Sequence, residues 1–255
     1  MKIVRVIVAA LAICTAVAQT VRAQEKQILP AGTYRLEMIL GTITRLPFFG
    51  SSKSASKSVS LVEIRHEETG LFQTHQVCDF RVLEDSRMVK IVFPEKFVAA
   101  LGNHSYPITI ERNGRDWHYR ADLGIERIGY HEEASNGQLP NTMNDPAVFD
   151  WDGDGHPGAT LKLTVPFLPE GELYIVQRGH SILNGRITEP GKVEGSVDVR
   201  VFEQRVLGAK PAFLNRSPQI EPNAKESRFS LTALPQGSTC ESLRNPTVKP
   251  IEFAP

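Results

Sequence analysis

The chain has 255 residues, and 29 Lys and Arg balance 29 Asp and Glu, while 41% of the residues are hydrophobic. This composition excludes a disordered chain, because enough apolar side chains are present to form a core. The formal net charge is zero and the basic residues are scattered among acidic ones, so we expect no nucleic acid as a partner.

The N-terminus has the pattern of a secretory signal. Lys2 and Arg5 precede an apolar run over 6–18, which is shorter than the roughly 20 residues that span a bilayer. We expect residues 1–23 to be a signal peptide that is cleaved after Ala23, with cleavage after Ala18 as the alternative. No later run is apolar enough for a transmembrane helix. The sequence therefore predicts a secreted or periplasmic protein.

The mature chain, 24–255, has the alternating pattern of an all-β protein. Over 161–167 and 193–201 apolar residues or glycine recur at every second position, and over 72–82 the same period appears with Thr74 and Gln76 among the alternating residues. We expect about ten mostly antiparallel strands. They are expected near 33–44, 59–66, 71–83, 88–93, 107–112, 116–122, 160–167, 172–178, 181–188 and 193–206.

Turn sequences join these strands into a hairpin meander. Examples are Asn113-Gly114, Asn184-Gly185 and Pro190-Gly191. A long meander must protect its edges, so we expect a barrel, with a two-sheet sandwich as the alternative. One short helix is expected over 94–101, because proline stands at its start and glycine follows it.

Three segments interrupt the meander of this single β-rich domain. Residues 50–60 are rich in Ser and Lys, and we expect them to form a loop tip. Residues 123–158 form a long acidic loop, which exceeds an ordinary hairpin connection. A Pro-rich tail begins at about residue 235.

Two cysteines, Cys78 and Cys240, lie outside the expected signal peptide. Export to an oxidising compartment favours a disulfide between them. The alternative is a pair of buried free thiols. Neither cysteine has the spacing of a zinc site.

The long acidic loop contains the segment Asp-Trp-Asp-Gly-Asp-Gly-His-Pro-Gly over 150–158, which we name the Asp segment. Asp150, Asp152 and Asp154 alternate, and a glycine follows them directly. Calcium takes about six to eight oxygen ligands, and carboxylates two residues apart on a tightly turning backbone can converge on one ion. The pattern therefore predicts a calcium site, and the alternative is an Asp/Gly turn without metal.

The Asp segment resembles the first half of an EF-hand loop and the shorter Asp-rich loops of dockerins, thrombospondin type 3 repeats and integrin-like propellers. The resemblance implies that the three aspartates ligate calcium through their side chains and His156 through its backbone carbonyl. Gly158 and Leu161 stand where an EF-hand has further ligands, and a strand follows in place of a helix. The missing ligands must come from water or from Asp145, which is the nearest further carboxylate.

The sequence indicates no catalytic residue. His131, beside Glu132 and Glu133 in the same loop, is the nearest approach to an acid–base group. We therefore expect a non-catalytic, calcium-braced β-protein that binds an unidentified ligand or an envelope partner. The alternatives are a calcium-dependent hydrolase of an envelope polymer and a structural or adhesive surface component.

Overall fold

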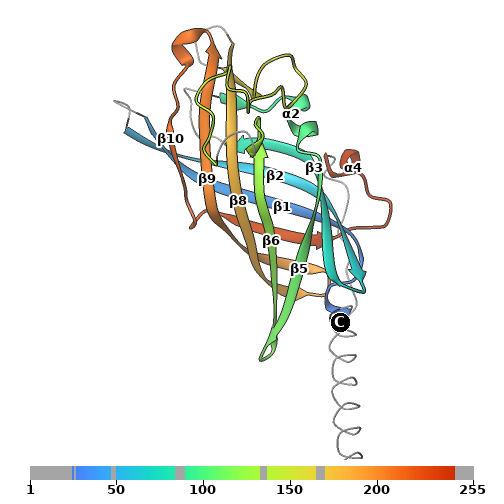
Figure 1. The fold of residues 1–255 in the computed structure, drawn as a ribbon. Coiled ribbons are helices and arrows are strands. Elements are labelled where there is room, and N and C mark those ends of the chain that lie inside the picture. Colours follow the sequence, from blue (N-terminus) through green and yellow to red (C-terminus); the bar gives the residue numbers. More distant parts are fainter. Residues whose placement is uncertain are drawn as a thin grey trace, which may run out of the picture.

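The computed structural model describes residues 25, 27–46, 50–83, 90–132, 137–164 and 170–244. Within them, strands form one 11-stranded sheet whose pairings are all antiparallel, which confirms the predicted all-β class (Figure 1). The expected signal peptide lies outside these residues. No helix in the described part of the chain has the length and apolar character that crossing a bilayer requires.

The strands are β1 (Gly32–Leu46), β2 (Gly50–Glu67), β3 (Gly70–Leu83), β4 (Lys90–Val92), β5 (Asn103–Asn113), β6 (Asp116–Ile128), β7 (Ala159–Thr164), β8 (Gly171–Glu189), β9 (Lys192–Lys210), β10 (Gln219–Pro222) and β11 (Arg228–Ala233). The helices are α2 (Glu95–Ala100), the 3₁₀ helix η1 (Ala212–Leu214) and α4 (Cys240–Arg244).

Eight of the strands close into a ring, although it is not a regular barrel. The order is β8, β6, β5, β3, β2, β1, β11 and β9, and the pairing of β9 with β8 completes the circuit. Strands β7 and β4 continue from the edge of β8, and β10 pairs with the end of β1. The ring thus leaves few strand edges unpaired, as a meander of this length requires.

One half of the ring is filled by an apolar core. Alternate side chains of each strand point inward, and Tyr34, Leu36, Val62, Leu183 and Leu231 are all at most 1% exposed. This core lies toward the turn between β5 and β6.

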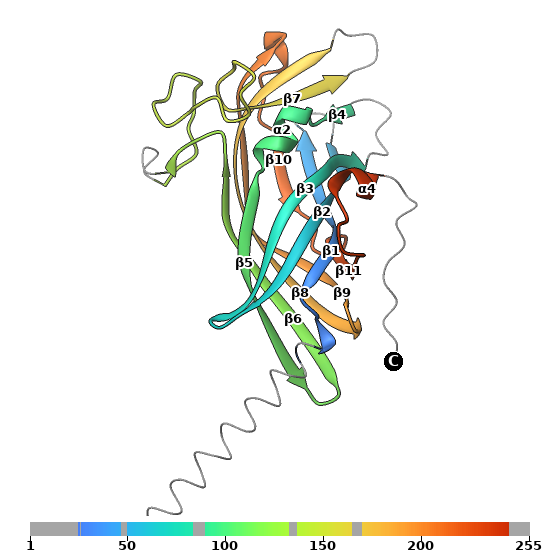
Figure 2. The ribbon, with the colours of Figure 1, turned by 90° about the vertical axis from the view of Figure 1, so that its right-hand side faces the viewer.

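A second apolar cluster closes the opposite end. Phe97 and Leu101, at α2, pack with Ile128, Ile175 and Val206. Figure 2 shows α2, β4 and β7 together at this end, with the β5–β6 turn at the other. The helix follows Pro94 and precedes Gly102, as predicted.

Between the two apolar clusters, β5 and β6 are neighbours in the ring but do not pair with each other. These strands pair only from Ile108 to Asn113 of β5. Beyond this stretch β5 pairs with β3, whereas Ile125 to Ile128 of β6 pair with β8. Gly124, at φ +63°, lies where the register of β6 shifts. Figure 1 shows the two strands diverging, and we name this unpaired stretch the β5–β6 gap.

Two sequence predictions about strands are wrong. Residues 50–60 are not a loop tip, because they extend β2 along β1, and Ser58 and Ser60 are buried in the sheet. The two strands expected at 172–178 and 181–188 are one strand, β8. A shift in register at His180 and Ser181 interrupts its apolar phase, and Asn184-Gly185 is not a turn.

The C-terminal segment is attached to the outer face of β2 and β3. The sulfur atoms of Cys78 and Cys240 lie at disulfide distance, as the sequence predicts, with the Cα atoms 5.0 Å apart. Arg244 donates a hydrogen bond of 3.0 Å to the carbonyl oxygen of Cys78. Leu234 and Leu243 are buried beside these contacts.

Candidate functional site

The Asp segment is a compact turn held against β8. Its ends are joined by hydrogen bonds from Trp151 N–H to the carbonyl of Gly158 (3.0 Å) and from Gly158 N–H to the carbonyl of Phe149 (2.8 Å). Gly158 has φ +83°, and a Cβ atom there would lie 2.5 Å from the carbonyl oxygen of Ile175. Only glycine therefore allows the segment to lie so close to β8.

The three aspartates of this segment converge. One carboxylate oxygen from each of Asp150, Asp152 and Asp154 lies within 4.8 Å of the others. Asp150 accepts hydrogen bonds from the N–H groups of Asp154 (3.0 Å) and Gly155 (2.9 Å). Asp154 accepts one from the N–H of His156 (2.8 Å). The backbone of the turn thus holds three like charges together.

Asp152 has the least complete hydrogen bonding of the three aspartates for its degree of burial. The residue is 8% exposed, and its Oδ2 atom accepts a hydrogen bond from the N–H of Thr160 at 3.0 Å. Its Oδ1 atom is buried and has no hydrogen-bond partner among the described residues. Burial raises the pKa of Asp152, and the charges of Asp154 and Asp150 raise it further, against the effect of the Thr160 bond. A bound cation would supply the missing partner of Oδ1 and offset this repulsion.

The donor set fits a hard divalent cation. All three groups offer carboxylate oxygen, which suits calcium or magnesium, whereas zinc prefers imidazole and thiolate. The imidazole of His156 stacks on Tyr174 with ring centroids 4.6 Å apart. The expected metal ligand from His156 is therefore its backbone carbonyl oxygen. Asp145 accepts a hydrogen bond from the N–H of Ala147 at 2.9 Å. The participation of the His156 carbonyl and of Asp145 stays a prediction.

The Asp segment is connected to the β5–β6 gap through α2. The ring of Trp151 packs on Phe97, with centroids 5.3 Å apart. Lys96 donates a hydrogen bond of 2.6 Å to the carbonyl of Gly153. At the end of the helix, the carbonyl of Leu101 is 2.8 Å from Nε2 of His104, which borders the gap. A fixed Asp segment would therefore help to hold α2 and His104 in place.

His131 and Glu132, the acid–base candidates from the sequence, both contact neighbouring side chains. The imidazole of His131 stacks on Phe149, with centroids 4.1 Å apart. Glu132 forms ion pairs with Arg127 and Arg178. Glu133 lies outside the described residues. These contacts favour a bracing role for the described part of this group.

Four side chains on the inner face of the ring border the gap, and we name them the gap cluster: His75, His104, Tyr106 and Glu126. His75 and His104 are direct partners on β3 and β5, and Tyr106 stands two residues along. The ring of Tyr106 lies 5.0 Å from His75 and 6.3 Å from His104. Glu126 alternates with the buried Ile128, which places it on the inner face of β6.

Solvent reaches this part of the interior. His104 and Glu126 are exposed although both point inward. Burial nevertheless raises the pKa of Glu126, against the effect of His104. His75 is 8% exposed, and its Nε2 atom has no hydrogen-bond partner in the described part of the chain.

Sequence analysis missed the gap cluster. Its members come from three strands, and only the register of β3, β5 and β6 brings them together. One sequence feature could have indicated it. At the alternate positions between Leu71 and Val77, the polar residues Gln73 and His75 interrupt an otherwise apolar face of the strand.

Comparison with known proteins assigns no family. No protein-family model matches this chain, and no curated protein or solved structure matches it significantly. The Asp segment and the gap cluster are therefore the features on which function is argued.

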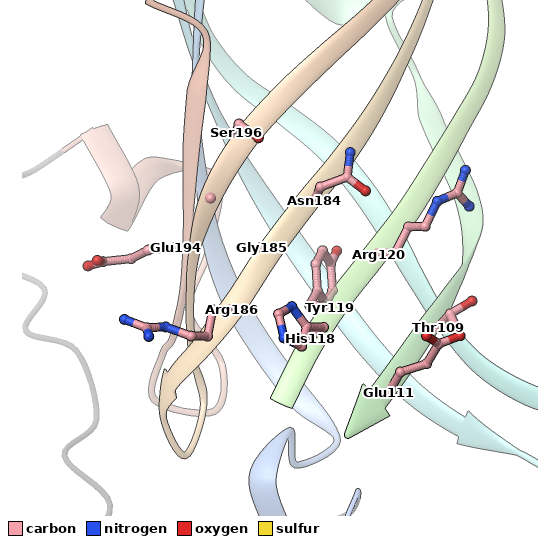
Figure 3. Close-up of a pocket in the computed structure, with 11 residues that line it drawn as sticks. Thr109, Glu111, His118, Tyr119, Arg120, Asn184, Gly185, Arg186, Glu194 and Ser196 are labelled. Atoms are coloured by element: carbon pink, nitrogen blue, oxygen red, sulfur yellow. The ribbon is translucent and has the colours of Figure 1, made fainter. Parts of the chain in front are cut away.

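A groove of about 500 Å³ lies on the outer face of β5, β6, β8 and β9 (Figure 3). Glu111 and Glu194 line it together with Arg120 and Arg186, so it carries charges of both signs. This mixture selects no class of charged ligand.

A second groove of about 770 Å³ lies beside β9 and β10. Arg178 donates hydrogen bonds to Glu203 (2.8 Å) and to the carbonyl of Gly137 (2.9 Å). Arg205 donates to the carbonyl of Leu139 at 2.7 Å. Arg178 and Arg205, which line this second groove, therefore attach the long acidic loop to β8 and β9.

Proposed function

We propose that this protein is an exported, non-catalytic binding protein in which calcium braces the ring of strands beside a ligand-binding interior. The observation that carries the proposal is the buried, unpartnered Oδ1 of Asp152 within a cluster of three carboxylates. Export rests on the sequence pattern of residues 1–23. An extracellular or periplasmic location also favours calcium over other hard cations.

Calcium supports the binding interior through α2. The ion neutralises the repulsion among the aspartates and fixes Trp151, which packs on Phe97. The helix in turn holds His104 at the gap. At free calcium 100-fold above its Kd, binding stabilises the folded state by about 2.7 kcal/mol.

The polar interior supports ligand binding. Concave sites that bind small molecules combine apolar walls with a few convergent polar groups. The gap cluster supplies polar groups of this kind, because His75, His104 and Tyr106 lie along the pairing of β3 with β5 between Val77, at the second apolar cluster, and Ile108, in the first. The hydrolase alternative needs a free acid or base in the loop, and Glu132 there is ion-paired with Arg127 and Arg178, which disfavours it in that role.

Calorimetric titration of calcium into residues 24–255 tests the metal proposal. We expect one saturable site in the unmutated protein. Asp152→Asn removes the charge and leaves an oxygen for the Thr160 N–H, so it should weaken calcium binding at least 10-fold while the fold persists. The matched control is Asp116→Asn, which changes an exposed aspartate at the start of β6. Unchanged calcium affinity in Asp152→Asn, or no binding by the unmutated protein at millimolar calcium, would refute the proposal.

A further inference from the structure

We infer that the second groove, between β9 and β10, binds an extended segment of a partner protein, which pairs with β9 as an added strand. The segment carries apolar side chains on the face turned to the interior of the ring and basic side chains on the other face. This interaction surface is separate from the proposed calcium site and from the gap cluster. Two features of the structure carry it: an unpaired strand edge and a groove of about 770 Å³ alongside that edge.

The upper part of β9 has one unpaired edge. β9 pairs with β11 only over Lys192–Ser196, and beyond this stretch β8 is its one strand partner among the described residues. β10 runs beside this edge but forms its hydrogen bonds with β1 (Figure 1). An unpaired edge is a template on which another chain can form a strand.

A hydrogen bond at the upper end shows which backbone groups of β9 face this edge. The N–H of Val206 donates to Oγ of Ser217, just before β10, at 2.9 Å. Alternate residues of a strand direct their backbone groups to the same edge, and the register of β9 is regular from Val201 to Val206. The N–H and carbonyl groups of Phe202 and Gln204 therefore face the groove, where the described residues provide no strand partner for them.

β10 forms the opposite side of the groove. The N–H of Asn223 donates to the carbonyl of Gly41, on the β1 side, at 2.8 Å. By the same alternation, Ile220 directs its N–H and carbonyl groups toward β9. Pro218 and Pro222 have no N–H, so β10 offers little pairing on this side. β9 is therefore the edge to which a segment would pair.

The groove follows the edges of the two strands. It is lined by the consecutive residues 202–205 of β9 and 218–221 at β10, and consecutive residues of a strand point to opposite faces of the sheet. A ligand site on one face would be lined by alternate residues only. An added strand lies about 4.8 Å from its neighbour, so it would occupy this space.

The inner face of the groove is apolar. Phe202 alternates with the buried Val206, which places its side chain toward the interior of the ring. Ile220 pairs with Thr44, which alternates with Leu40 of the apolar core. Side chains that lie opposite each other on neighbouring strands share a face. The inward side chains of the segment would therefore contact Phe202 and are apolar.

The accessible charge of the groove is acidic. The side chains of Glu203 and Glu221 are 49% and 50% exposed, whereas that of Arg178 is 20% exposed and pairs with Glu203. The guanidinium of Arg205 donates to the carbonyls of Leu139 and Pro140. The two glutamates thus favour Lys or Arg on the outward face of the segment.

The test uses residues 24–255 and a peptide of seven alternating lysine and valine residues, which has one basic and one apolar face as a strand. Binding is followed by calorimetry and by the backbone amide NMR signals. We expect saturable binding, with shifted signals and slower hydrogen exchange at the N–H groups of Phe202 and Gln204. A peptide with glutamate in place of lysine should bind at least 10-fold more weakly.

N-methylation of the peptide separates strand pairing from charge attraction. Valine residues opposite Phe202 and Gln204 direct their N–H groups to β9, whereas the lysine N–H groups point away from it. N-methylation of the valines should lower the affinity at least 10-fold, and N-methylation of the lysines should change it less than 3-fold. This comparison leaves the protein itself unaltered.

Two variants of the protein test the groove from the other side. Gln204→Pro removes an N–H that faces the groove and leaves the pairing with β8, so it should lower the affinity at least 10-fold while circular dichroism shows the strands intact. Glu221→Gln should lower it at least 3-fold. The matched control, Glu194→Gln in the first groove, should leave it unchanged.

Four outcomes would overturn the inference. The first is no saturable binding of the lysine–valine peptide. The second is full affinity of the peptide with N-methylated valines, which would indicate charge attraction without strand pairing. The third is a set of shifted amide signals away from β9 and β10. The fourth is a dimer in sedimentation that the peptide dissociates, which would assign this edge to a second copy of the chain.

Discussion

At the scale of single residues, His75 combines burial with an unpartnered ring nitrogen on the inner face of β3. Burial, with a smaller effect of His104, lowers its pKa from 6.5 to about 3. In the unfolded chain the imidazole takes up a proton as the pH falls through 6.5, whereas in the folded protein it stays neutral. The folded state therefore loses stability between pH 6.5 and about 3.

The resulting prediction concerns acid sensitivity. Between pH 6 and 5, His75 should lower the free energy of unfolding by up to about 1.4 kcal/mol per pH unit. His75→Gln should remove this slope, as measured by urea unfolding at pH 7, 6 and 5. His118→Gln, which changes an exposed histidine of β6, is the control and should retain the slope. An equal slope in all three proteins would contradict the assignment.

Residues of the candidate site differ in how far the sequence predicts them. Asp150, Asp152 and Asp154 are neighbours along the chain, so their spacing alone indicates convergence. His75 and Glu126 are distant in sequence and meet only through strand register. A local pattern carries no information about such a meeting.

At the scale of elements, the C-terminal segment is a short piece of chain fastened to the outside of β2 and β3. Its own packing is limited to side chains such as Leu234 and Leu243. The Cys78–Cys240 link spans a sequence separation of 162 residues and restricts the unfolded chain strongly.

Loss of this link should lower stability while the ring remains. We expect Cys78→Ala/Cys240→Ala to lower the free energy of unfolding by about 2–5 kcal/mol. Guanidinium unfolding measures the difference, and far-ultraviolet circular dichroism checks that the strands persist. An unchanged unfolding midpoint would show that the two sulfurs are not bonded in the native protein.

Most strands are predictable because their alternation is local. The first half of β2 escapes prediction, because its Ser and Lys residues resemble a loop and only pairing with β1 reveals a strand. Strands β10 and β11 also escape prediction. They are short, and they add to β1 from the distant C-terminal part of the chain.

At the scale of the whole molecule, the ring encloses one filled half and one polar, water-accessible region beside the gap. Closure through β11 and divergence at Gly124 both depend on long-range pairing. The all-β class is therefore predictable from the sequence, whereas the closure of eight strands into a ring that is not a regular barrel depends on this long-range pairing. The proposed calcium site would connect local chemistry to this architecture, because Trp151 and Lys96 fasten the Asp segment to α2.

The most direct test of calcium bracing is the melting temperature of unmutated residues 24–255 in chelator and in millimolar calcium. With calcium at 100-fold its Kd, we predict that the Tm rises by about 5–10 °C. Fluorescence of a Trp117→Phe variant, which leaves Trp151 as the sole tryptophan, should change over the same calcium range. If both the Tm and this fluorescence are identical in chelator and in calcium, the Asp segment is a turn without metal and the account of a calcium-braced ring is wrong.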